Sequence, residues 1–122
     1  MKTVTEHIRD HLLGKTAGLV DRKKMPTLDQ LRRSEWDEEF ERLMRNRLLM
    51  GAFRYGLLED PGKGAYDHLG SIRRRLEMYE ADGNLEHLVD AANICLVEFH
   101  AGRRRGQSLS PQDDGEHCIK VN

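Results

Sequence analysis

The chain has little of what stabilises a small secreted domain or a β-sheet protein. Its 122 residues include only 2 cysteines, 3 prolines and 6% aromatic residues. A core must therefore be built mainly from Leu, Ile, Val, Met and Ala, which suits packed helices better than a β-sandwich. We expect no structural disulfide, because Cys95 lies in an apolar helical pattern and Cys118 in a polar segment. Cys95 is predicted to be a small core residue.

The chain also lacks a dominant charge and a long apolar run. Its formal net charge is −1, which gives no chain-wide attraction to nucleic acids or anionic membranes. The longest apolar stretches span only a few residues, and residues 1–6 are mostly polar or charged, so neither a membrane span nor a signal peptide is predicted. We expect a cytoplasmic protein without a nucleic-acid or membrane partner.

What the chain does contain is a strong helical pattern. Apolar residues recur at three- and four-residue intervals in three long segments, 35–55, 68–82 and 85–101. The proposed core positions are Trp36, Phe40, Leu43, Met44, Leu48, Ala52 and Tyr55 in the first segment, Leu69, Ile72, Leu76 and Tyr79 in the second, and Leu85, Leu88, Val89, Ala92, Leu96 and Phe99 in the third.

Capping residues punctuate this pattern. We expect the three long helices to end at Gly56, Gly83 and Gly102. Asp67 and Asn84 are expected to cap the starts of the second and third of them.

Two shorter helices precede the long ones. One is predicted over 4–13 with Thr3 or Thr5 as its cap, and one follows Thr27, which has capping-box spacing to Gln30. The expected fold is therefore all-α: a compact bundle of three long helices plus one or two short N-terminal helices. We predict a single domain over 1–102, followed by an extended polar C-terminal tail over 103–122.

The third long segment carries the most informative polar group. Glu86, Asp90 and Asn93 fall on one helical face at four- and three-residue spacing. Most of the remaining circumference is apolar, so we expect Asp90 and Asn93 to be substantially buried. A buried carboxylate needs a cation or a hydrogen-bond donor as its partner.

Two interpretations of this face stay open. In the first, Glu86 and Asp90 bind a divalent cation together with Glu38 and Glu41, since magnesium favours oxygen ligands and also holds substrate phosphates. In the second, Asp90 pairs with an arginine or caps a neighbouring helix, and the glutamates are solvated. His87 is a candidate acid, base or ligand, or a partner for an adjacent carboxylate.

Several residues are candidates for contacting a phosphate-rich ligand. Lys63 lies in a loop with Pro61 and two glycines, and Arg47 and Arg54 lie in the first long segment. The loop lacks the spacing of a P-loop, so an ordinary turn and intramolecular ion pairs are the alternatives. Asn93, on the same helical face as Asp90, is a further candidate for contacting this ligand.

Four stretches resemble small uncharacterised proteins of phages and prophages. They cover about half the chain and read LLMGAFRYG at 48–56, YD at 66–67, SIRRRLEMY at 71–79 and GNLEHLVDAAN at 83–93. This resemblance implies no particular activity.

A Glu-x-x-Glu helix followed by a later helix with a carboxylate pair ending in Asp is similar to the MazG-like, all-α nucleoside triphosphate pyrophosphohydrolases. The resemblance implies that Glu38, Glu41 and Asp90 are magnesium ligands, that nucleotides are cleaved between the α and β phosphates, and that the protein forms a dimer or higher oligomer. Where that family has a glutamate three residues before the aspartate, this chain has His87, with Glu86 displaced by one position.

Two functions follow from these observations. The first is a magnesium-dependent nucleotide pyrophosphohydrolase, or a nucleotide-binding helical protein of phage type. The alternative is a non-catalytic helical protein that binds and modulates a host protein. The first requires carboxylates to converge across two helices, and the second requires an exposed patch.

Overall fold

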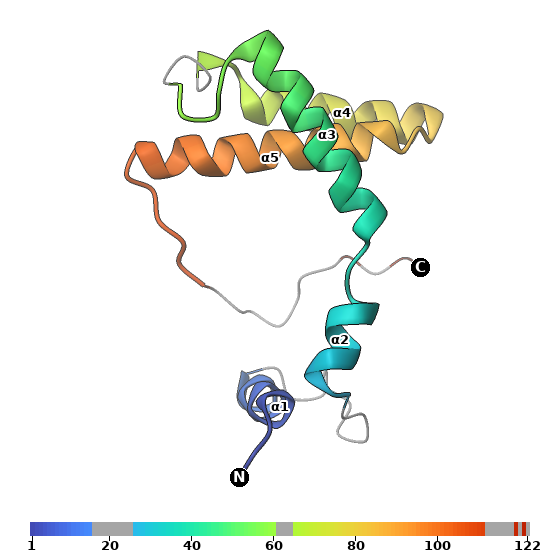
Figure 1. The fold of residues 1–122 in the computed structure, drawn as a ribbon, viewed down its shortest axis with the longest axis vertical. Coiled ribbons are helices and arrows are strands. Elements are labelled where there is room, and N and C mark those ends of the chain that lie inside the picture. Colours follow the sequence, from blue (N-terminus) through green and yellow to red (C-terminus); the bar gives the residue numbers. More distant parts are fainter. Residues whose placement is uncertain (16–25, 61–64, 112–118, 120, 122) are drawn as a thin grey trace. The chain divides into compact units, whose positions relative to one another are not determined.

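The computed structural model describes residues 1–15, 26–60, 65–111, 119 and 121 (Figure 1). Within these residues every regular element is a helix, which confirms the all-α prediction. The chain divides into two compact units, 1–36 with 110–122 and 37–109. The predicted division into 1–102 and 103–122 stays a prediction.

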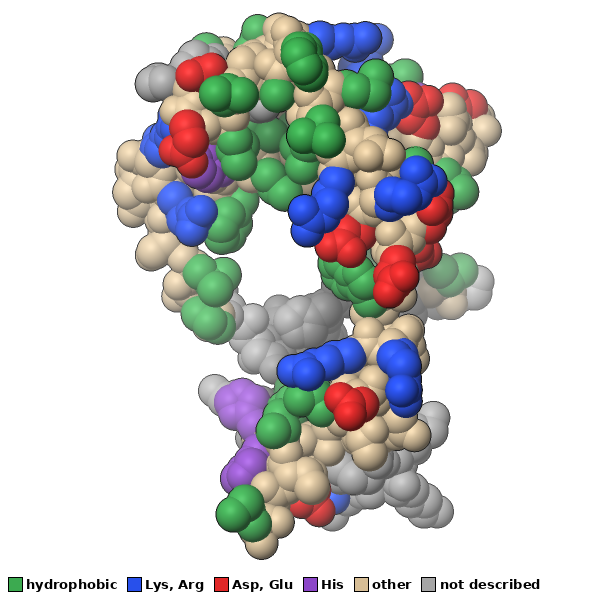
Figure 2. Space-filling view, in the orientation of Figure 1, with side chains coloured by type: hydrophobic (Ala, Val, Ile, Leu, Met, Phe, Trp, Pro, Cys, Tyr) green, Lys and Arg blue, Asp and Glu red, His purple; other side chains and the backbone are tan. Residues whose placement is uncertain are grey.

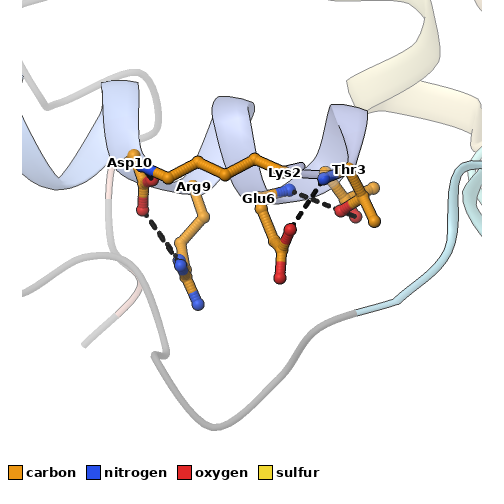
Figure 3. Close-up of polar contacts among 6 residues, drawn as sticks. Lys2, Thr3, Glu6, Arg9 and Asp10 are labelled. Carbon is orange, nitrogen blue, oxygen red and sulfur yellow. Dashed lines mark hydrogen bonds and ion pairs between the residues drawn. The ribbon is translucent and has the colours of Figure 1, made fainter.

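The first unit contains α1 (Val4–Lys15) and α2 (Leu28–Ser34). Thr3 and Glu6 form a reciprocal cap at the start of α1: the Thr3 N–H donates to Glu6 Oε2 at 2.7 Å, and the Glu6 N–H donates to Thr3 Oγ1 at 3.2 Å (Figure 3). These bonds satisfy two backbone donors that the first turn of a helix leaves without partners. Thr3 therefore fills the predicted capping role.

Charged side chains add a second group of contacts on α1. Lys2 Nζ lies 2.5 Å from Asp10 Oδ2, and Arg9 Nη2 lies 3.0 Å from Asp10 Oδ1 (Figure 3). The hydrogen bonds from Lys2 and Arg9 hold the pKa of the Asp10 carboxyl below its ordinary value.

The predicted capping box of α2 is also present, with Thr27 and Gln30 exchanging both bonds.

The second unit is formed by α3 (Glu38–Tyr55), α4 (His68–Asp82) and α5 (Glu86–Arg104). Helix α5 packs along α4 and is crossed by α3 (Figure 1). The tight connection between α4 and α5 needs a left-handed residue, and Gly83 supplies it with a φ of 69°.

Aspartates start two of these helices. The Asp37 side chain accepts from the Phe40 N–H, and the Asp67 side chain accepts from the Gly70 N–H. Asp67 was predicted as a cap, whereas the first long helix was predicted to begin at Glu35. That boundary is wrong, because Asp37 adopts an extended backbone and uses its own side chain to close the first turn of α3.

The prediction of Trp36 as a core residue is also wrong. Trp36 precedes α3 and is 61% exposed. No residue of α3 is buried, and Leu43 and Tyr55 are exposed. Helical periodicity identified the helix but not the face that packs, because α3 carries apolar residues on more than one side.

The hydrophobic core of the described residues is small. Its buried apolar members are Val89, Ala91 and Ala101, all on α5. Predicted core positions Leu85 and Phe99 are exposed, and so are Leu69, Leu76 and Leu96.

Cys95 is exposed as well, which corrects its assignment to the core. Cys118, the other partner in the disulfide question, lies outside the described residues.

Helix α5 extends past its predicted end. Gly102 was expected to stop it, but the helix continues to Arg104 and Gly102 is buried. The Gly102 carbonyl accepts from the Gln107 N–H at 2.9 Å, and the left-handed turn falls instead at Gly106, with a φ of 90°. The left-handed glycine that terminates α5 is therefore Gly106, about one turn after the Gly102 that the sequence pattern indicates.

Among the described residues, each helix is too short or too polar to cross a lipid bilayer.

Candidate ligand pocket

The three helices of the second unit enclose a pocket of about 350 Å³. This volume is within the range of small-molecule sites. Its walls come from α3, α4, α5 and the segment before α4: Arg47, Leu48, Met50, Gly51, Arg54, Tyr55, Tyr66, His68, Ser71, Arg74, Arg75, Asp90, Asn93, Ile94 and Val97.

Four arginines line this pocket, and they fall into two pairs. Arg47 and Arg75 share Asp90: Arg47 Nε lies 3.6 Å from Asp90 Oδ1, and Arg75 Nη1 lies 3.9 Å from Asp90 Oδ2. Arg54 and Arg74 form no ion pair with any carboxylate among the described residues. The pocket therefore carries excess positive charge, which favours an anionic ligand.

An aromatic and apolar surface lies beside these arginines. The Tyr55 and Tyr66 rings meet edge to face, with centroids 5.6 Å apart and planes at 77°. Tyr55 belongs to the last turn of α3, and Tyr66 precedes the Asp67 cap of α4. With Leu48, Ile94 and Val97 in the same walls, the pocket presents an apolar surface that suits a planar ring.

A buried histidine forms a third feature of the wall. His68, 8% exposed, lies with Nδ1 at 2.9 Å from Glu98 Oε2, and Arg105 Nη2 donates to Glu98 Oε1 at 2.6 Å. The hydrogen bonds from His68 and then Arg105 hold the pKa of the Glu98 carboxyl below its ordinary value. This chain of contacts ties the first turn of α4 to the end of α5.

Asn93 connects α5 to α3. It is 7% exposed, as its predicted burial requires, and its Nδ2 donates to the Met44 carbonyl at 3.0 Å. Its Oδ1 is buried and accepts no hydrogen bond from the described residues. Asn93 also lines the pocket, but its Oδ1 has almost no solvent-accessible surface and is therefore not open to a ligand.

The structure brings some of the predicted site residues together. Arg47, Arg54, Asp90 and Asn93 all line the pocket. Glu86 lies beside them through its ion pair with Arg47. Asp90 pairs with Arg47 and Arg75, as one of the two open interpretations expects.

Three other predicted site residues that the structure describes, Glu38, Glu41 and His87, are not among the residues that line the pocket. Glu38 is exposed in the first turn of α3, and Glu41 pairs with Arg45 at 3.2 Å. His87 is buried, with Nε2 2.9 Å from Asp82 Oδ2. Lys63 lies outside the described residues.

The carboxylates do not gather into a metal-binding cluster in the described part of the chain, where no three His, Cys, Asp or Glu side chains are grouped to hold an ion. Glu86 and Asp90 face arginines instead. The magnesium site therefore stays a prediction.

The His68–Glu98 pair is hard to predict from the sequence. The two residues are 30 positions apart, and neither interrupts an apolar pattern. Tyr66 carried a weak signal, because it follows the loop considered for phosphate contact. Only the packing of α4 on α5 brings His68 to Glu98, and of these two residues His68 lines the pocket.

Comparison with known proteins adds one relative. The chain is 30% identical over 82 residues to an uncharacterised protein of Haemophilus influenzae, a match that covers 67% of this chain and 18% of that protein. The chain thus spans less than a fifth of the length of this relative. No protein family matches the chain, and no solved structure matches it significantly.

Proposed function

We propose that the pocket binds a nucleotide or a closely similar phosphorylated aromatic compound. The observation that carries this proposal is the pair Arg54 and Arg74, which line the pocket without a carboxylate partner among the described residues, beside Tyr55 and Tyr66. Such a ligand combines an anionic part for the arginines with a ring for the aromatic wall.

The arginines have different roles in this proposal. Arg54 and Arg74 bind the phosphates directly, since guanidinium groups match phosphate oxygens in charge and geometry. Arg47 and Arg75 are partly neutralised by Asp90, so they contribute less to affinity and instead hold the wall in place. Helices α3, α4 and α5 serve as a compact three-helix scaffold around the site. We also propose, as the sequence analysis expects, that the protein is of phage type and acts in the cytoplasm.

A calorimetric titration tests the proposal. The panel contains nucleoside triphosphates, diphosphates and monophosphates, the free nucleosides, and inorganic pyrophosphate, each with and without magnesium. We expect saturable binding that strengthens with phosphate number and is weaker for either half of the ligand alone. Release of pyrophosphate during incubation with a triphosphate would show that the protein also catalyses the hydrolysis that the MazG-like resemblance implies.

Matched variants separate the pocket from general electrostatics. Arg54→Gln and Arg74→Gln should each weaken nucleotide binding by at least about tenfold, because a charged hydrogen bond contributes about 1.5–3 kcal/mol. Arg73→Gln is the control, since Arg73 is an exposed residue of α4 outside the pocket walls. An equal loss in all three variants, or no binding anywhere in the panel, would contradict the proposal.

A further inference from the structure

Asp90 places an acceptor in the pocket wall that no described residue uses as a hydrogen-bond partner. Its side chain is 20% exposed. Arg47 Nε and Arg75 Nη1 approach it only to 3.6 and 3.9 Å, beyond the usual N–H···O range of about 2.7–3.2 Å. Arg47 makes its closer contact with Glu86. The two arginines therefore hold the Asp90 carboxylate in place by charge and leave its oxygens available to a donor on a ligand.

The pocket changes character along its length. Asp90, Ile94 and Val97 share one face of α5 at four- and three-residue spacing, so the carboxylate lies at one end of an apolar strip. On α3, Arg54 follows Arg47 by two helical turns on the same face, a rise of about 10 Å. Figure 2 shows a similar change over α3, from charged side chains of both signs at its N-terminal half to hydrophobic side chains around its C-terminal end. The two ends of the pocket therefore suit different parts of a ligand.

This arrangement orients the nucleotide of the proposed function, on which this inference rests. A carboxylate repels phosphate groups, whereas Arg54 attracts them, so the uncharged base is the part that faces Asp90. The rise of about 10 Å from Arg47 to Arg54 is comparable with the length of a nucleotide from the outer edge of its base to its first phosphate. Because a carboxylate only accepts hydrogen bonds, the edge of the base that meets Asp90 must carry donors.

We propose that Asp90 selects guanine by accepting hydrogen bonds from the ring N1–H and the 2-amino group of the base. Among the common bases, guanine alone presents two adjacent donors on this edge. Adenine and cytosine place a ring-nitrogen acceptor beside their amino group, and uracil flanks its N3–H with two carbonyls, so each brings a lone pair against the carboxylate. A site built around a paired polar contact rejects ligands that leave its groups unpaired. The ligand class is therefore a guanine nucleotide.

Calorimetric titration of the full chain with GTP, ATP, CTP and UTP tests this selection. The titrations are made with EDTA, which keeps a metal ion from bridging Asp90 to a phosphate, and are repeated with magnesium. We expect GTP to bind at least about tenfold more tightly than the other three, the value of one charged hydrogen bond. Inosine triphosphate, which lacks the 2-amino group, should fall between GTP and ATP.

Other outcomes separate this inference from the proposed function. Equal affinities for all four nucleotides would overturn the selection of guanine and leave a general nucleotide site standing. Binding of none of them, with EDTA or with magnesium, would overturn both. If dGTP binds more weakly than GTP while the bases are not distinguished, Asp90 contacts the ribose hydroxyls and the proposal is wrong.

Asp90→Asn is the decisive variant, because it should exchange one base preference for another. An asparagine amide offers one acceptor and one donor, which matches the N1–H and the 2-carbonyl group of xanthine but not the paired donors of guanine. We expect the variant to bind GTP at least about tenfold more weakly than the parent chain and xanthosine triphosphate at least about tenfold more tightly. Equal weakening of both nucleotides would mean a structural role for Asp90 and would overturn the proposal.

Glu86→Gln is the matched control. It removes the same charge from a carboxylate that pairs with Arg47 but is not among the residues that line the pocket. The preference for GTP should be unchanged in this variant, and circular dichroism establishes that both variants are folded. A loss of base preference in Glu86→Gln equal to that in Asp90→Asn would contradict a direct contact between Asp90 and the base.

Discussion

Asn93 shows how one polar side chain joins two helices of the second unit. It is 7% exposed and its amide reaches the Met44 carbonyl at 3.0 Å. We expect Asn93→Ala to be less stable than Asn46→Ala by about 1 kcal/mol, the typical net value of one hydrogen bond. Asn46 is an exposed helical asparagine, so the gain in helix propensity on changing to alanine is shared and cancels in the comparison.

Urea unfolding of dilute protein measures this difference. If thermal unfolding is measured instead, a loss of about 1 kcal/mol lowers the melting temperature of a small domain by about 4–8 °C. Equal stabilities of the two variants would mean that the contact between Asn93 and Met44 contributes nothing to the packing of α5 on α3.

Glu98 gives the second unit a dependence on pH. The hydrogen bonds from His68 and Arg105 lower the pKa of its carboxyl below the ordinary value of 4.5. A carboxyl with a lowered pKa in the folded state contributes stability that is present above pH 4.5 and is lost as the pH falls through the folded value. We expect Glu98→Gln to lower the melting temperature at pH 7 and to lower it less at pH 3.

The control for this measurement is Glu77→Gln, an exposed glutamate of α4. It should move the melting temperature little at either pH, because exposed carboxylates contribute little to stability. A Glu98→Gln effect of the same size at both pH values would show that shape, and not charge, accounts for the contact with His68.

At the scale of helices, two glycines are expected to respond in opposite ways to alanine. Gly83 ends α4 with a φ of 69°, a conformation that a side chain disfavours even though no atom lies within 4 Å of an added Cβ. Gly51 lies inside α3, where the nearest atom to an added Cβ is Tyr55 Cδ2 at 4.0 Å. We expect Gly83→Ala to destabilise the fold by about 1 kcal/mol and Gly51→Ala to stabilise it by about 0.5–1 kcal/mol.

Thermal unfolding followed by circular dichroism compares the two variants with the parent chain. Each serves as the other's control, since both add the same methyl group. A stable Gly83→Ala variant would mean that the turn between α4 and α5 adopts another conformation.

Helix existence was predictable because the caps act locally. Thr27 with Gln30 and Asp67 with Gly70 form the bonds that their spacing indicates. The boundary at Glu35 was wrong because Asp37, two residues later, is a competing cap that closes the first turn of α3. The end of α5 was wrong because the Gly102 carbonyl accepts from Gln107 within an extended last turn, so the glycine does not need to leave the helix.

At the scale of the whole molecule, the small core makes stability sensitive to a bound ligand. The only buried apolar side chains in the described chain are Val89, Ala91 and Ala101. A nucleotide that binds the folded chain and not the unfolded chain raises the melting temperature by mass action. We expect this rise in the parent chain and a smaller rise in Arg54→Gln, because Arg54 lines the pocket.

Differential scanning calorimetry over a hundredfold range of nucleotide concentration makes the comparison. A parent melting temperature that is independent of nucleotide concentration would contradict the proposed binding.

Sequence alone determined the all-α class, most helix starts and the polar character of the α5 face, because caps and periodicity depend on neighbours along the chain. The same reasoning placed Arg47, Arg54, Asp90 and Asn93 in a candidate site, and all four line the pocket. Only tertiary structure decided that Asp90 faces arginines and that His68 meets Glu98 across 30 residues. It also decided which side of α3 is left exposed, since each of these depends on how separate helices pack and leaves no periodic trace in the chain.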